Sequence, residues 1–95
     1  MDSLTFNSQL STPNLIECVP NFSEGRNLDT INAIAEAIAS VGGVRVLHID
    51  RGEAANRTVI TFVGESHKVV EAAFRAVRKA SELIDMRHHH GEHPR

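Results

Sequence analysis

Residues 88–93 hold four of the six histidines in the sequence, which makes this stretch the first candidate for chemistry. Neutral imidazole is a common zinc ligand. A helix through the stretch would place His89 and His93 on one face, at the spacing of two metal ligands. Gly91 and Pro94 argue against such a helix, because neither residue type favours a helix interior.

Residues 88–90 have a second interpretation, as the polar and solvated end of a helix, where protonated imidazoles interact favourably with the helix dipole. His93 differs from them because it precedes Pro94, and a residue before proline is biased towards extended backbone. His93 is therefore held in a restricted conformation between the carboxylate of Glu92 and, two residues on, the guanidinium of Arg95. This arrangement suits a positioned acid–base group.

A second polar group, Asn21, Ser23 and Glu24, follows the first predicted strand. Polar side chains on a loop can contact a ligand from a rigid scaffold. The alternative is turn chemistry, in which Asn and Ser bond to nearby backbone and Gly25 relaxes the chain before a helix.

The elements that position these residues can be predicted from periodicity. Residues 15–19 read as a short strand closed by Pro20, and residues 21–25 as a loop. A helix is expected from an N-cap at Asn27 to the Gly42–Gly43 pair, with Asp29 at the favourable end of its dipole. By their spacing, the residues expected on its buried face are Ile31, Ile34, Ala35 and Ile38.

The second half of the chain predicts two strands and a helix. Residues 44–49 form a buried strand that ends at Asp50, residues 50–56 a loop, and residues 58–63 a second strand, antiparallel to the first. A helix follows over residues 66–86. Its predicted buried stripe consists of Val70, Ala73, Val77, Ala80 and Ile84.

The order β-α-β-β-α predicts an α/β (α+β) sandwich with both helices on one face of a mixed sheet. It lacks only the last strand of the ferredoxin-like, or split βαβ, unit. A chain of 95 residues holds one domain at most. Residues 1–14 are polar and aperiodic, so we expect a flexible N-terminal extension there, ahead of a folded segment over residues 15–95.

Composition excludes several classes of protein. The formal net charge is -2 and the basic residues are scattered, so nucleic acid is not an expected partner. The first 14 residues have neither a basic start nor a long apolar run. We therefore expect no membrane association and a cytoplasmic location. The single cysteine, Cys18, has no internal disulfide partner and is expected to be an inert, partly buried thiol.

Four strings carry a resemblance to a known family. Residues 17–26 read ECVPNFSEGR, residues 56–59 NRTV, residues 83–86 LIDM and residues 89–95 HHGEHPR. In this order they resemble the formiminotransferase N-terminal subdomain, and the resemblance covers about the first half of that subdomain. In the family, folate binds in a cleft between two packed α/β subdomains, so the remaining walls of that cleft are expected outside this chain.

The resemblance implies glutamate formimidoyltransferase activity, which transfers a formimino group between N-formimino-L-glutamate and the co-substrate tetrahydrofolate in histidine degradation and one-carbon metabolism. His93 matches the catalytic histidine and would act first as general base and then as general acid. Asp50 matches a site aspartate that would orient this imidazole or stabilise its charged form. Arg57 and Arg95 would bind carboxylates of glutamate or of the folate tail, unless they form surface ion pairs, and Asn21 would contact the ligand. No metal is implied.

Two other functions remain open at this stage. A truncated paralogue would keep the half-fold as a non-catalytic folate-binding or protein-interaction module. Its unpaired sheet edge and uncovered sheet face would favour a homo-oligomer or docking on the missing half of the domain. A histidine-rich metal-binding protein would instead bind zinc through residues 88–90.

Overall fold

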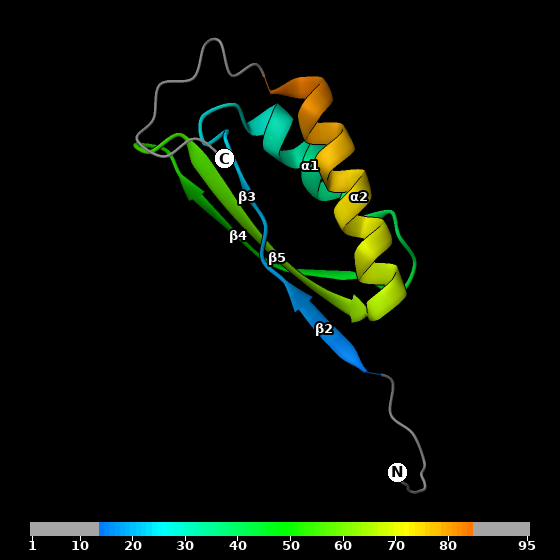
Figure 1. Cartoon of the computed structure of the whole chain (residues 1–95). Helices are drawn as coiled ribbons and strands as arrows, with labels where there is room; N and C mark the ends of the chain where they lie inside the picture. Colours follow the sequence, from blue (N-terminus) through cyan, green and yellow to red (C-terminus); the bar gives the residue numbers. More distant parts are fainter. Residues whose placement is uncertain (1–13, 85–95) are drawn as a thin grey trace, which may run out of the picture.

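The fold is a two-layer sandwich in which both helices cover one face of a sheet (Figure 1). The computed structural model describes residues 14–84. Its elements are β2 (Leu15–Cys18), β3 (Asn21–Phe22), α1 (Leu28–Ala39), β4 (Arg45–Gly52), β5 (Arg57–Glu65) and α2 (Ser66–Leu83). The expected fold class is confirmed. The N-terminal extension expected up to residue 14 lies, except for Asn14, outside the described residues.

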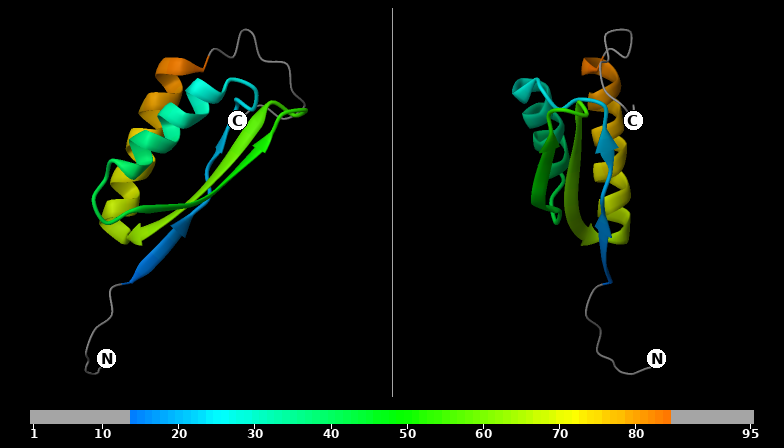
Figure 2. Two further views of the ribbon diagram at one scale, coloured as in Figure 1. Left: turned by 180° about the vertical axis from the view of Figure 1, so that it is seen from behind. Right: turned by 90° about the vertical axis from the view of Figure 1, so that its left-hand side faces the viewer.

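The central strand of the sheet is β5, which pairs with β4 on one side and with β2 and β3 on the other (Figure 2, right). All three pairings are antiparallel. The prediction of a mixed sheet was therefore wrong for the described strands. The α1 crossover does make β2 and β4 run in the same direction, but β5 lies between them, so every neighbouring pair is antiparallel.

The strands β2 and β3 form one interrupted line along β5. Leu15 lies opposite Glu65 and Asn21 opposite Val59, so the register does not change between the two strands. The backbone N–H of Ile60 donates to the carbonyl of Pro20 at 3.1 Å, which keeps the chain beside β5 across the gap. The loop predicted over residues 21–25 therefore begins with a strand, because proline interrupts the ladder without turning the chain away.

The hairpin of β4 and β5 is longer than the sequence indicated. Pairing continues to Gly52 opposite Arg57, so Asp50 lies inside β4 rather than at its end. The strands close through a tight turn in which Asn56 adopts a φ of 54°. Asparagine tolerates this left-handed backbone better than most residues, which lets the ladder run on into a stretch that looks like a loop in sequence.

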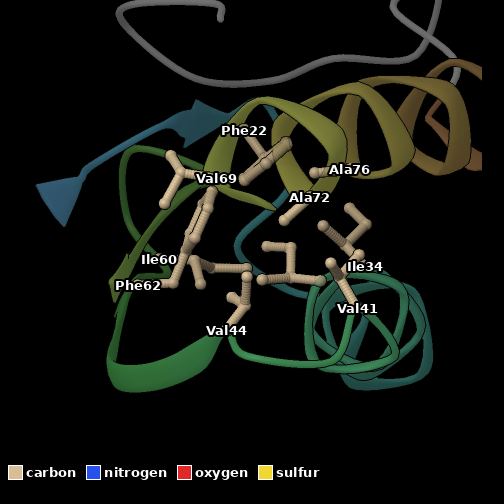
Figure 3. Close-up of a cluster of buried hydrophobic side chains, with 10 residues drawn as sticks. Phe22, Ile34, Val41, Val44, Ile60, Phe62, Val69, Ala72 and Ala76 are labelled. Carbon is tan, nitrogen blue, oxygen red and sulfur yellow. The ribbon is translucent and has the colours of Figure 1, made fainter. Parts of the chain in front are cut away.

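The first helix begins as predicted at Asn27, whose side-chain oxygen accepts a hydrogen bond from the N–H of Thr30 at 3.2 Å. Its predicted stripe is confirmed, with three isoleucines buried and Ala35 partly buried. Figure 3 shows Ile34 among the side chains of the core between the helices and the sheet. The buried apolar cluster contains Phe22, Ile34, Ile38, Val41, Val44, Ile60, Phe62, Val69, Ala72 and Ala76. Cys18 is partly buried and packs against this cluster.

The second helix presents to the core a face that overlaps the predicted one only in part. Val69, Ala72 and Ala76 are buried. Of the predicted stripe, Ala73, Ala80 and Ile84 are partly buried against the core, whereas Val70 and Val77 are 68% and 63% exposed. The apolar sector of α2 is wider than one packing contact needs, so periodicity alone centred the stripe too far to one side. None of the helices in the described residues is long and apolar enough to cross a membrane.

Substitutions of adjacent valines test this assignment. Val69→Ala should lower the free energy of unfolding by about 2 kcal/mol, because it removes buried methyl groups from the core. Val70→Ala should change it by less than about 0.5 kcal/mol, because that side chain is already in solvent. Urea unfolding followed by circular dichroism measures both. A larger loss for Val70→Ala than for Val69→Ala would mean that the predicted stripe is the buried one.

Candidate functional site

The two faces of the sheet differ in chemistry. Along β5, side chains alternate between the core, where Thr58, Ile60 and Phe62 are buried, and the opposite face, where side chains are only half-buried. Both helices lie on the core side (Figure 2, left). We call the opposite side the open face, and it is the surface on which polar side chains of the sheet are accessible.

Three of the predicted site residues lie on the open face. Asn21 of β3 and Asp50 of β4 both lie opposite Val59, so the three form one row across the sheet. Opposed residues of antiparallel strands project on the same side, and two strand spacings place Asn21 and Asp50 about 10 Å apart. Arg57, two residues before Val59 on β5, projects on this same side. The row therefore has an amide at one end, a carboxylate at the other and a guanidinium beside it.

Asp50 and Arg57 have no charged partner within residues 14–84. Asp50 is exposed, and within residues 14–84 its carboxylate is in no ion pair or side-chain hydrogen bond. Arg57 is half-buried and likewise has no ion pair among the described residues. A carboxylate can accept a hydrogen bond from an imidazole or amine, and a guanidinium can bind a carboxylate through two parallel bonds. The interpretation of Arg57 as half of a surface ion pair is therefore not supported in the described part of the chain.

His48 is a further polar residue on the open face, and the sequence reasoning did not single it out. It lies on β4 two residues before Asp50, opposite Thr61, and its side chain is exposed. The signal was present in the sequence, because residues two apart on a strand share a face. Which face the two residues share depends on the β-bulge between Val46 and His48, and that bulge cannot be seen from the sequence.

The loop after β3 has a structural role. The Glu24 carboxylate accepts hydrogen bonds from the N–H groups of Arg26 and Asn27, at 3.0 and 2.9 Å, which satisfies free donors ahead of α1. The Thr58 hydroxyl donates to the Glu24 carbonyl at 2.5 Å, and Ser23 is buried. The turn-chemistry interpretation therefore holds for Glu24, whereas Asn21 lies on the open face.

Gly25 fixes this loop against the β4–β5 hairpin. Its N–H donates to the side-chain oxygen of Asn56 at 2.8 Å. The Arg26 guanidinium donates to the carbonyls of Glu53 and Ala54 at 3.0 and 3.2 Å. The segment that carries Asn21 and the hairpin that carries Asp50 and Arg57 are thus held together by one network at the same end of the sheet.

His93 and Arg95 lie outside the described residues, as do the remaining histidines of residues 88–90. The zinc site that the sequence left open for these histidines therefore also lies outside the described residues. Within residues 14–84, no group of three His, Cys, Asp or Glu side chains is arranged to hold a metal ion.

The domain is of the α/β class, with a row of polar residues on the open face of its sheet. Comparison with known proteins gives its family. Residues 15–95 match the model of the formiminotransferase domain, N-terminal subdomain. The chain belongs to this family.

Individual relatives agree with that assignment. The chain is 57% identical over 81 residues to the formimidoyltransferase-cyclodeaminase of Sus scrofa, a match that covers 85% of this chain and 15% of the relative. It is 56% identical to the glutamate formimidoyltransferase of Thermoplasma acidophilum and 47% identical to that of Streptococcus pyogenes, in each case over 85% of this chain and 27% of the relative. The chain thus spans about a quarter or less of the length of these relatives.

Proposed function

We propose that this chain is a segment of a glutamate formimidoyltransferase, acting in the cytoplasm, and that its open face forms one wall of the site where a formimino group passes between N-formimino-L-glutamate and tetrahydrofolate. The observation that carries the proposal is the row of Asn21, Val59 and Asp50 with Arg57 beside it, in a chain of this family. Such a wall needs accessible polar groups on a firmly paired backbone, and the pairing of β3 and β4 with β5 supports this.

The proposed chemistry assigns one role to each group. His93 removes a proton as the folate nitrogen attacks the amidine carbon, and returns one to the departing glutamate nitrogen. Asp50 accepts a hydrogen bond from the imidazole and so orients it. Arg57 and Arg95 bind substrate carboxylates, and Asn21 contacts the ligand from the far end of the row. No step in this scheme requires a metal.

The test uses a chimera, since the chain covers only 27% of the Thermoplasma acidophilum enzyme. Residues 15–95 replace the matching 81 residues of that enzyme, and formimino transfer to tetrahydrofolate is assayed. Asp50→Asn should lower kcat by at least about tenfold, because the amide cannot stabilise a charged imidazole, while KM changes little. Glu53→Gln is the matched control, because Glu53 is an exposed carboxylate in the neighbouring turn. Equal kcat values for Asp50→Asn and the unsubstituted chimera would remove Asp50 from the proposal.

A non-catalytic interaction module is the second candidate function. The observation in its favour is a stripe of exposed apolar residues on α2, Val70, Phe74 and Val77, which the site on the open face does not use.

A further inference from the structure

His48 shares the open face with Asp50, and the proposed chemistry gives it no role. The pairing of β4 with β5 places His48 opposite Thr61 and Asp50 opposite Val59. Thr61 and Val59 are two residues apart on β5, and both belong to its half-buried, open side. The Cα atoms of His48 and Asp50 are therefore about 7 Å apart, with both side chains on one face.

A β-bulge turns both side chains to this face. From Val46 to His48 the chain of β4 advances by two residues, while β5 advances by one, from Phe62 to Thr61. Val46 packs against the core, so an unbroken alternation would point His48 and Asp50 towards the core as well. The extra residue reverses this phase. Bulges are common next to active sites, where they redirect side chains, and here one bulge presents His48 and Asp50 together.

The side chain of His48 can donate a hydrogen bond to a ligand. It is exposed, and within residues 14–84 it is in no ion pair. His67, by contrast, lies 3.9 Å from the Glu65 carboxylate. An imidazole carries at least one N–H in either protonation state, and a carboxylate accepts from it. A substrate carboxylate is therefore a chemically suitable partner for His48.

The charges around His48 favour an anion on the side away from Asp50. Arg45 lies on that side, on the same face and one paired step further along the hairpin, about 7 Å from His48. Arg45 is exposed and has no ion pair in the described part of the chain. Of the described acidic groups on this face of the neighbouring strands, Glu17 is about 10 Å from Arg45 across β5. Glu65 already lies 3.9 Å from a histidine of α2. A carboxylate held by His48 is thus attracted by Arg45 as well.

The position of His48 distinguishes between the carboxylates of the two substrates. In the proposed reaction, the amidine carbon of N-formimino-L-glutamate reacts at the part of the site that Asp50 marks. Five bonds separate this carbon from the γ-carboxylate carbon, which is about 6 Å in an extended conformation. The carboxylates of tetrahydrofolate lie beyond a benzoyl ring, on the order of 13 Å from the reacting nitrogen. The spacing of about 7 Å between His48 and Asp50 matches the shorter distance.

We propose that His48 binds the γ-carboxylate of N-formimino-L-glutamate, assisted by the positive charge of Arg45, and so makes the site specific for the glutamyl side chain. This inference rests on the proposed function, because it assigns a contact within the same site. His48 is a substrate-binding residue in this scheme and takes no part in the proton transfers. Arg57, on the other side of Asp50, is left for another substrate carboxylate.

The test pairs a change in the chimera with a change in the substrate. N-formimino-L-glutamate is compared with N-formimino-L-glutamine, in which a neutral amide of similar shape replaces the γ-carboxylate. In the unsubstituted chimera, kcat/KM should be at least about tenfold lower for the amide, because a hydrogen bond to a charged group is the stronger one.

His48→Ala should lower kcat/KM for N-formimino-L-glutamate at least about tenfold, through a higher KM, and should have little effect on the amide. This non-additivity is the signature of a direct contact, since a merely structural role would lower both values by the same factor. His48→Gln keeps a side-chain N–H and should hold KM within about threefold. His48→Glu should raise KM for N-formimino-L-glutamate at least about 30-fold, because it places two like charges together.

His67→Ala is the matched control, because the side chain of His67 is 70% exposed at the start of α2, and both kcat/KM values should stay within about twofold. Circular dichroism checks that each variant is folded, and His48→Gln and His48→Glu carry the comparison if His48→Ala is not.

An active chimera in which His48→Ala lowers kcat/KM for both compounds equally, or for neither, overturns this inference and leaves the proposed function standing. A higher KM for tetrahydrofolate with an unchanged KM for N-formimino-L-glutamate also overturns it. A folded chimera that transfers no formimino group contradicts the proposed function itself, and this inference with it.

Discussion

Replacing His93 with alanine in the chimera should lower kcat for formimino transfer by about 10² to 10⁴, the usual contribution of a positioned general acid–base group. The expectation rests on the match of residues 15–95 to the family and on the role that the resemblance implies for His93. Alanine can neither accept the proton of the attacking nitrogen nor return one to the leaving nitrogen. Steady-state kinetics with tetrahydrofolate and N-formimino-L-glutamate measure the effect.

His88→Ala is the control for this result, since His88 is a nearby histidine for which we expect only a solvated position. Its kcat should stay within about twofold of the unsubstituted chimera, as for a surface change. A loss in both variants together with loss of bound zinc would favour the metal-binding interpretation of the cluster. Full activity in His93→Ala would contradict the assignment of the acid–base group.

Gly25→Ala should destabilise the chain by about 3 kcal/mol or more, the upper range for overpacking a buried site. A Cβ at this position would lie 2.5 Å from the Gly52 carbonyl oxygen, 2.7 Å from the Arg57 nitrogen and 2.9 Å from the Arg57 carbonyl oxygen. All three are backbone atoms of the β4–β5 hairpin, so relief would require the hairpin to move away from the loop after β3. Urea unfolding measures the loss.

Gly42→Ala is the matched glycine, because a Cβ there meets no atom within 4 Å and its φ is not in the left-handed region. Its free energy of unfolding should change by less than about 1 kcal/mol. Similar stabilities for the two variants would show that the hairpin and the loop are not held as closely as the structure has them. The Gly25 contact matters for function as well, since it joins the segments that carry Asn21, Asp50 and Arg57.

Local signals in the sequence predicted much of this fold. The N-cap at Asn27 and the isoleucine stripe of α1 are properties of neighbouring residues, and the structure has them as expected, whereas the helix ends at Ala39, with Ser40 as its C-cap, before the glycine pair is reached. The β-branched runs located the two strands of the hairpin, but β4, predicted as a buried strand, is mostly exposed, with Leu47 48% and Ile49 39% exposed, because the helices cover only one face of the sheet. Such elements are determined by propensity and periodicity within a short window.

The errors arose where distant segments decide the structure. The sequence of α2 offers a broad apolar sector, and only the position of α1 and the sheet determines which part of it is buried. The strand β3 exists because β5 continues beside it past Pro20. The antiparallel sheet follows from the insertion of β5 between β2 and β4. None of these contacts leaves a local pattern in the sequence.

In the candidate site, too, local sequence signals and contacts between distant segments had different roles. Asn21, Asp50 and Arg57 were chosen by residue type and resemblance, but only the register of two strands against β5 places Asn21 and Asp50 in one row. Glu24 looked like a ligand-binding residue from its polarity and proved to cap the approach to α1. Residue type identified the candidates, and strand pairing separated those on the open face from those that brace the loop.

The most direct test of the central claim is the rate of formimino transfer by the unsubstituted chimera. If residues 15–95 form a wall of the site, the chimera should transfer the formimino group to tetrahydrofolate with a kcat/KM within about tenfold of the parent enzyme, a loss of at most about 1.4 kcal/mol of transition-state stabilisation. A chimera that folds like the parent by circular dichroism but transfers no formimino group would contradict the claim.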